Sequence, residues 1–210
     1  SFAAGETSFL DRIEVVNGPA SVMYGQVTPG GMLGMSLKKP TDTAFHQVSI
    51  GFGNWGRYEA TVDVSDKITK SGNLRYRIAA IGVTQGTQTD HVDYHRVGVL
   101  PSITWDIDNK TSLTLLGSYM YTPGDGLNTT AYPALGTVVT SNGLPRISRS
   151  TFLSTPNWNK HGEKDAMFEY QFKHEFNKFL NFSQTFRWEE SQRTSAGTFF
   201  DGALSQTQIG

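Results

Sequence analysis

The feature that most constrains the fold is a set of segments in which apolar and polar residues alternate strictly. In residues 58–65 the even-numbered side chains are aromatic or aliphatic, and the odd-numbered ones are polar or charged (Glu59, Thr61, Asp63, Ser65). A helix would mix the two sets, because its side chains repeat every 3.6 residues rather than every two. The pattern therefore predicts β-strands with one apolar face and one polar face.

The same alternation recurs along most of the chain after residue 46. It predicts about seven strands of roughly 8–12 residues, in the segments 47–53, 58–65, 75–80, 96–107, 112–119, 168–173 and 180–189. The turns at 108–110 and 177–178 are tight and polar, whereas the connections 84–95 and 121–164 are long; the short connection 54–56 departs from this scheme. Short turns at one end and long loops at the other are typical of the wall of an outer-membrane β-barrel.

A soluble antiparallel sandwich would also alternate, but two features favour the barrel. The apolar face is aromatic and aliphatic over strands about as long as a bilayer needs. The polar face carries charges that suit a water-filled lumen, namely Arg75, Arg77, Glu169, Lys173, Arg187 and Glu189. We therefore expect an all-β fold: a partial transmembrane antiparallel barrel wall with Tyr58, Val62, Ile103, Phe168 and Phe182 facing lipid.

Composition excludes several other classes of protein. The chain has a net charge of −1, which gives no support for binding nucleic acid. It has no Cys, which excludes a disulfide framework, a thiol nucleophile and a Cys-based zinc site. No run of about 18 apolar residues is present, so a transmembrane helix is not expected. No Ser-His-Asp or paired-carboxylate arrangement stands out, and we expect no enzyme.

Residues 1–40 differ from the rest of the chain, because Gly and Pro are dense in them. Two strand-like pieces, 9–16 and 32–39, lie between these residues and predict a compact module of small strands and tight turns. Its motifs have fixed spacing: Asp11-Arg12-Ile13-Glu14-Val15, then Gly18-Pro19, Ser21-Val22-Met23-Tyr24-Gly25, Pro29-Gly30-Gly31 and Lys38-Lys39-Pro40. This combination resembles the end of the plug domain of TonB-dependent outer-membrane receptors.

The resemblance implies a fragment of a larger receptor with two parts. Residues 1–42 would be the C-terminal part of the plug, and residues 43–210 the first strands of the barrel. The family implies a location in the outer membrane of a Gram-negative bacterium and contact with its lipid. It also implies import of a ferric siderophore driven by the TonB-ExbB-ExbD complex, whose contact segment is not in this chain. No cofactor or resident metal is expected, because iron would enter only within the bound ferric siderophore.

Downstream motifs point to one branch of that family. Pro101-Ser102-Ile103-Thr104-Trp105 resembles an early barrel strand of siderophore receptors, and Pro133 with Gly136-Thr137-Val138 resembles a long loop of the ferrichrome and other hydroxamate receptors. In those receptors, aromatic residues of this loop line the binding pocket. The resemblance thus implies ligand contacts by Tyr132, Tyr121 and Trp158. The alternative is that these aromatic side chains only hold the loop folded.

The plug must fill the lumen and yet be movable, which favours a polar, hydrated contact with the wall, since water can replace each lost hydrogen bond. We expect Arg12 and Glu14 of the plug to meet charged wall residues such as Arg75 and Arg77. The alternative is that Arg12 and Glu14 pair with each other on their own strand. The family commonly has Lys or Arg where Asn17 stands, so one plug–barrel ion pair of the family is in doubt here.

Two other functions remain open at this point: a passive porin-like channel, and a surface adhesin or phage-docking barrel. The motif-rich module at residues 10–40 argues against the porin, which has no reason to carry it. His91, Asp93 and His95 alternate along the chain and would share one side of a strand. A metal site there is not expected, because a chelated ferric ion needs no protein ligands.

Overall fold

The structure, a computed structural model, describes residues 6–17, 31–125, 136–139, 143, 145–156 and 158–197. These residues form two antiparallel β-sheets and one short 3-10 helix, η2 (Thr7–Phe9). The small sheet pairs β1 (Leu10–Asn17) with β2 (Gly31–Leu37), and we call it the N-terminal hairpin. No helix in the described part of the chain is long and apolar enough to cross a membrane.

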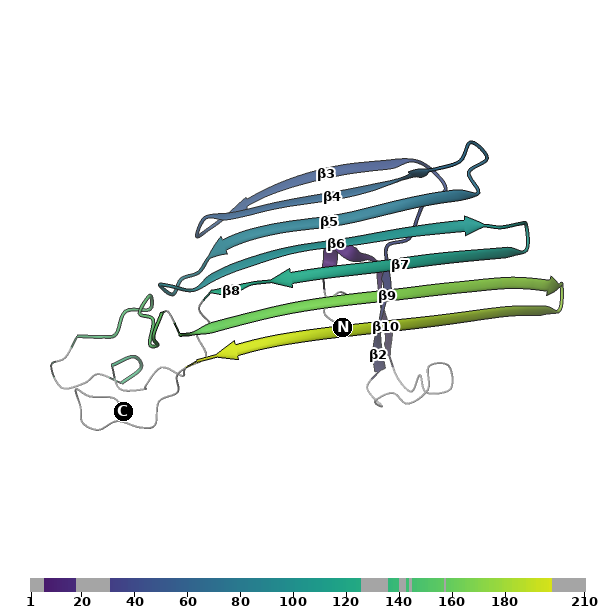
Figure 1. The fold of residues 1–210 in the computed structure, drawn as a ribbon. Helices are drawn as coiled ribbons and strands as arrows, with labels where there is room; N and C mark the ends of the chain where they lie inside the picture. The colour runs from purple at the N-terminus through teal and green to yellow at the C-terminus, as the bar shows by residue number, and fades with distance from the viewer. Residues whose placement is uncertain are drawn as a thin grey trace.

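The large sheet, here called the wall, places its strands side by side in the order β10-β9-β7-β6-β5-β4-β3, with the short β8 next to β6 and β9 (Figure 1). Its strands are β3 (Phe45–Gly53), β4 (Arg57–Lys67), β5 (Leu74–Gly86), β6 (Asp93–Asp106), β7 (Thr111–Thr122), β8 (Gly124–Asp125), β9 (Lys160–Asn177) and β10 (Leu180–Ala196). The sheet curves but does not close, because β3 and β10 are its two edges. The predicted all-β, partial-barrel fold class is confirmed.

Every predicted strand is present, and each of the seven long wall strands is longer than the segment from which it was predicted. β9 has 18 residues and β10 has 17, and both extend toward the end of the wall that carries the long connection 123–159. The extra residues at the start of β9, such as Lys160, Glu163 and Asp165, are polar and interrupt the aromatic pattern of its later half. Backbone pairing with β7 and β10, which needs no apolar face, continues the strand there.

The tight turns at the opposite end of the wall are stabilised by side chains that accept backbone hydrogen bonds. The Asp108 carboxylate accepts from the Lys110 N–H at 2.7 Å and from the Thr111 hydroxyl at 3.0 Å, and these bonds lower the pKa of Asp108. The Asn177 side chain accepts from the backbone of Phe179 and Leu180. Such local bonds are the reason that Asp and Asn favour turns.

The two faces of the wall differ as the alternation predicted. The residues expected to face lipid, Tyr58, Val62, Ile103, Phe168 and Phe182, are all exposed on the side away from the N-terminal hairpin. The opposite side, here called the inner face, is covered in part by the hairpin and by η2, which Figure 1 shows lying across the wall strands. Polar residues on this face are buried, among them Asp63, Ser65, Arg77, Ser102 and Glu169.

The hydrophobic core lies between the N-terminal segment and the inner face. Phe9 of η2 is fully buried, and its ring is close to Gly98 of β6. The core is completed by apolar residues on the otherwise polar face, namely Ala79, Ile81, Val83, Leu100, Leu116, Met120 and Met167, together with Leu37 of β2. The contact, expected to be polar and hydrated, is therefore apolar at its centre, where Phe9 is fully buried.

We expect Gly98→Ala to weaken the seating of Phe9 on the wall. A Cβ at Gly98 would lie 2.6 Å from Met120 Sδ and 3.1 Å from Phe9 Cζ, so both side chains would have to shift. Overpacking of this kind costs about 1–3 kcal/mol. The measurement is urea unfolding of the N-terminal segment in the full-length protein. Gly82→Ala is the control, because a Cβ there meets nothing within 4 Å; equal effects of the two changes would contradict the prediction.

Candidate functional site

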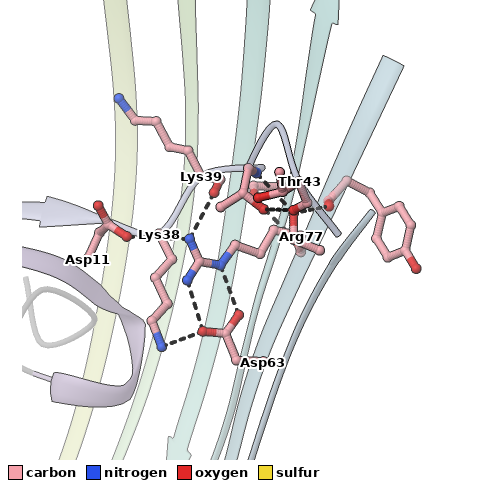
Figure 2. Close-up of polar contacts among 10 residues, drawn as sticks. Asp11, Lys38, Lys39, Thr43, Asp63 and Arg77 are labelled. Carbon is pink, nitrogen blue, oxygen red and sulfur yellow. Dashed lines mark hydrogen bonds and ion pairs between the residues drawn. The ribbon is translucent and has the colours of Figure 1, made fainter. Parts of the chain in front are cut away.

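The N-terminal hairpin and the wall meet through a cluster of buried charges centred on Asp63 of β4. Arg77 of β5 binds this carboxylate with two hydrogen bonds, from Nε at 2.8 Å and from Nη2 at 2.9 Å. Lys38, just after β2, contacts the same carboxylate, with Nζ 2.7 Å from Oδ2. Figure 2 shows both cations joined to the Asp63 carboxylate. One wall carboxylate thus holds a wall cation and a hairpin cation together.

Arg77 makes two further contacts that join the wall to the hairpin. Its Nη1 donates to the backbone carbonyl of Lys39 at 3.0 Å and lies 3.4 Å from the Asp11 carboxylate (Figure 2). Arg75 lies two residues before Arg77, on the same face of β5. It pairs with Asp42 of the connecting segment and with Asp106 of β6. The two wall arginines predicted as plug contacts therefore both reach the N-terminal part of the chain.

Two more polar contacts extend this interface on either side. The Lys39 ammonium donates to Gln171 of β9 at 2.7 Å; burial lowers the pKa of Lys39, and the nearby Glu169 carboxylate opposes that shift. Toward the other end of the wall, Glu6 accepts from Arg96 of β6 at 2.9 Å. The boundary expected at residues 42–43 stays a prediction, and the two sheets lie on either side of it.

Arg12 and Glu14 form an ion pair with each other, with Arg12 Nη2 3.1 Å from Glu14 Oε1. Their side chains are 65% and 48% exposed, and in the described part of the chain no ion pair joins either of them to the wall. This local pairing is the alternative that the sequence left open. The residues of the N-terminal segment that do meet the wall arginine Arg77 are Asp11 and Lys39, and both lie within motifs that the sequence had singled out.

A polar cavity of about 860 Å³ lies between η2 and the inner face, at the end of the wall that carries the long connection. Glu6, Thr7 and Ser8 line it on one side, and wall residues of β3 to β6 line it on the other, among them Arg57, Glu59, Tyr94 and Arg96. The Arg96 guanidinium lies 5.3 Å from the centre of the Tyr94 ring, and Arg57 donates to Gln85 at 2.6 Å. Its volume and its mixed donors and acceptors fit a small polar ligand.

Of the aromatic residues predicted as ligand contacts, the two that the structure describes, Tyr121 and Trp158, do not line this cavity. Tyr132 lies outside the described residues. Tyr121 shares the outer face of β7 with Tyr119, and the Lys164 ammonium is 5.6 Å from the centre of its ring. Trp158 is 62% exposed near the end of the long connection. The outward position of Tyr121 suits the membrane interface, where aromatic rings gather in barrels, and its role in ligand binding stays a prediction.

Sequence reasoning missed Tyr94, Arg57 and Arg96. The signal that could have found them is position: each lies on the polar face, in the first residues of a strand that follows a loop at the cavity end. Among the described residues, no group of three His, Cys, Asp or Glu side chains is placed to hold a metal ion.

We compared the chain with families and proteins of known identity. No family model matches the chain. It is 29% identical over 201 residues to the ferrioxamine B receptor of Salmonella typhimurium, covering 96% of this chain and 28% of that protein. It is 29% identical to the ferrichrome outer membrane transporter/phage receptor of Escherichia coli, covering 93% of this chain and 26% of the relative.

Solved structures give the same fold. The pyoverdine outer membrane receptor of Pseudomonas aeruginosa, bound to pyoverdine, matches 90% of this chain and 27% of its own with a TM-score of 0.77 and 22% identity. The closed form of the ferric-catecholate import receptor of E. coli matches 94% of this chain and 29% of its own with a TM-score of 0.76 and 21% identity.

The hairpin seated on a charged inner wall is thus part of an outer-membrane receptor. Over nearly its whole length the chain is similar to a segment of outer-membrane receptors for ferric siderophores, the class that its sequence motifs had implied. It spans a little over a quarter of the length of the relatives it matches. That the N-terminal hairpin and η2 belong to a plug, and β3 to β10 to a barrel wall, stays a prediction.

Proposed function

We propose that the full receptor imports a ferric siderophore of the hydroxamate type across the outer membrane. The observation that carries the proposal is the plug hairpin held against the inner face by Lys38, Asp63 and Arg77. A plug fixed by buried ion pairs blocks a passive route, because a diffusing solute cannot repay the loss of these contacts. This argues for gated import and against a porin.

The contacts also suggest how the plug is both held and movable. Water can replace the contacts of the ion pairs one at a time. The buried contact between Phe9 and the apolar residues of the wall is lost only when the plug moves as a unit. Energy is then needed to open the path, and the TonB-ExbB-ExbD complex is the partner that the family supplies. The wall arginines Arg75 and Arg77 serve to position the plug, and they are not ligand contacts in this proposal.

The hydroxamate assignment rests on the names of the relatives, since two of them are receptors for ferrioxamine B and ferrichrome. The polar cavity beside Tyr94 and Arg96 supports a ligand with a polar organic shell. A surface role in phage docking is favoured only by the name of the E. coli relative. The relatives are named as a receptor and as a transporter/phage receptor.

The test is growth on a defined iron source. A strain that lacks its other receptors for the same ligand is given ferrioxamine B or ferrichrome as sole iron source, with and without the full-length gene. We expect growth only with the gene and only when TonB is intact. Excess inorganic iron is the control and should support all strains. Growth that does not depend on the gene for any ferric hydroxamate would contradict the proposal.

We expect Tyr132→Ala to lower affinity for the ferric siderophore, if the resemblance to hydroxamate receptors holds for the long connection. Loss of a buried aromatic contact of this size costs about 1–3 kcal/mol. The measurement is titration of the full-length receptor with ferrichrome, with surface abundance measured in parallel. Tyr119→Ala is the control, because Tyr119 is exposed on the outer face of β7. Unchanged affinity with lower abundance would show that Tyr132 only holds the loop.

A further inference from the structure

Two contacts join the connection between β5 and β6, residues 87–92, to the long connection 123–159. The Asp90 N–H donates to the Ser150 carbonyl at 2.8 Å. The next residue, His91, has its ring edge-on to the Phe152 ring, with the ring centres 5.9 Å apart. We call these four residues the loop clasp, and it lies at the end of the wall that is predicted to face the outside.

Each side of the loop clasp has hydrogen bonds of its own. In the β5–β6 connection, the Thr87 hydroxyl donates to the Thr89 carbonyl at 3.0 Å and accepts from the Thr89 N–H at 3.2 Å. In the long connection, the Ile147 N–H donates to the Gly136 carbonyl at 2.8 Å, and the Gly136 N–H donates to the Val139 carbonyl at 2.8 Å. Since both sides are folded locally, a contact that restrains one point of each side also restrains the neighbouring residues.

Away from the loop clasp, the two connections lie on either side of a cavity of about 620 Å³. Gln88 and Thr89 line it from the β5–β6 connection, and Thr137, Val138 and residues 146–149 line it from the long connection. Because a cavity separates this stretch, the relative position of the two connections depends mainly on the loop clasp.

The backbone of His91 lies in the left-handed region, with a φ of 60°. Residues other than glycine adopt this conformation rarely, although His, Asn and Asp do so more often than most. Such a backbone persists where the surrounding structure holds it, and it is frequent at functional sites. The ring contact with Phe152 is one interaction that holds His91 here.

We propose that His91 and Phe152 are positioning residues for siderophore binding. By joining the two connections, they set the place of the long connection, which carries the predicted ligand contacts Tyr132 and Trp158. Neither His91 nor Phe152 contacts the ligand in this proposal. The proposal rests on the proposed import of a ferric hydroxamate.

The sequence position of Tyr132 explains why the loop clasp affects binding. Tyr132 lies between Asp125, which pairs with Lys160 in the wall, and Gly136, which is bonded to Ile147. With an anchor on each side, the stretch that carries Tyr132 has less conformational freedom to lose when it binds a ligand. Release of the loop clasp should therefore weaken affinity without changing the transport step.

The test compares Phe152→Ala with Phe179→Ala in the full-length receptor. Phe179 is the matched control, because it is an exposed aromatic residue in the turn between β9 and β10, at the opposite end of the wall. We expect Phe152→Ala to raise the ferrichrome concentration that half-saturates uptake by at least about fivefold, since preorganisation of the site is lost. Surface abundance and the maximal uptake rate should not change. Phe152→Tyr keeps the ring and should keep the wild-type value.

His91→Asn tests the other ring, because asparagine also accepts a left-handed backbone. It should weaken ferrichrome binding as much as Phe152→Ala does. The double variant should be no weaker than either single variant, since both remove the same contact. In the Phe152→Ala receptor, Asp90→Cys and Ser150→Cys joined by a short bifunctional maleimide should restore affinity, and this chain has no native cysteine that could compete.

Amide hydrogen exchange of residues 145–156, measured without siderophore, shows separately whether the loop clasp restrains the long connection. Faster exchange in Phe152→Ala with unchanged half-saturation would overturn the positioning role, and so would a loss of abundance or of maximal rate in place of affinity. Equal exchange in Phe152→Ala and Phe179→Ala would overturn the loop clasp itself. Failure of the wild-type receptor to take up any ferric hydroxamate would contradict the proposed function and with it the positioning role, whereas the exchange result would stand.

Discussion

Asp63→Ala is expected to be the most damaging single change at the plug–wall interface. It removes the carboxylate that Arg77 and Lys38 share, and both cations would be left in a site where the side chains are largely buried. Breaking a buried pair by removing one partner costs about 3–5 kcal/mol, because the remaining charge is uncompensated. Arg77 keeps Asp11 and the Lys39 carbonyl, but neither replaces a two-point carboxylate contact.

The measurement is protease resistance and urea unfolding of the plug in the purified full-length receptor, with permeability of the outer membrane to a bulky antibiotic as the cellular readout. Asp66→Ala on the same strand is the control, since its carboxylate is partly exposed and 3.9 Å from His46. Lys38→Met removes only the plug cation and leaves the Asp63–Arg77 pair, so it should have a smaller effect. A plug as resistant in Asp63→Ala as in the control would show that the cluster does not hold it.

The sequence was sufficient for the strands and their faces because both depend on a local period. Neighbouring residues of a strand, such as Val62 and Asp63, face opposite sides of the sheet. A shift of one residue in the register would exchange the two faces. The plug was predicted from the family motifs. Local physics alone does not explain the spacing between Lys38-Lys39-Pro40 and the preceding glycines.

The partners across the interface could not be predicted in the same way. Lys38 and Asp63 are 25 residues apart, and their contact depends on how the hairpin lies across the wall, which no periodicity encodes. The apolar seat of Phe9 did leave a signal, because Leu100 and Leu116 fall on the polar face of their strands. Apolar residues on a lumen-facing row indicate contact with something other than water, and that signal was not used.

The ligand-binding residues were hard to predict from the sequence for a different reason. Tyr132 belongs to the long connection, where neither alternation nor a turn motif constrains position. Arg96 begins a predicted strand, whereas Tyr94 fell in the predicted connection 84–95, and only the position of η2 makes a cavity beside them. Candidate residues on regular strands could therefore be assigned to a face from sequence, and residues on the loop could not.

Val62→Arg is expected to prevent normal assembly of the receptor in the outer membrane. Val62 lies at the centre of β4 on the exposed outer face, and an arginine at the midplane of a barrel strand costs about 2–4 kcal/mol. Thr61→Arg is the matched control, because Thr61 is the neighbouring residue on the inner face and lines the polar cavity, where a charge can remain hydrated. Asp63→Arg is unsuitable, since it would place a third cation beside Lys38 and Arg77.

The measurement is the amount of heat-modifiable, folded receptor in outer-membrane fractions, which should fall for Val62→Arg and stay near normal for Thr61→Arg. If the two variants assemble equally, or in the reverse order, the outer face of β4 does not meet lipid and the orientation of the wall is wrong.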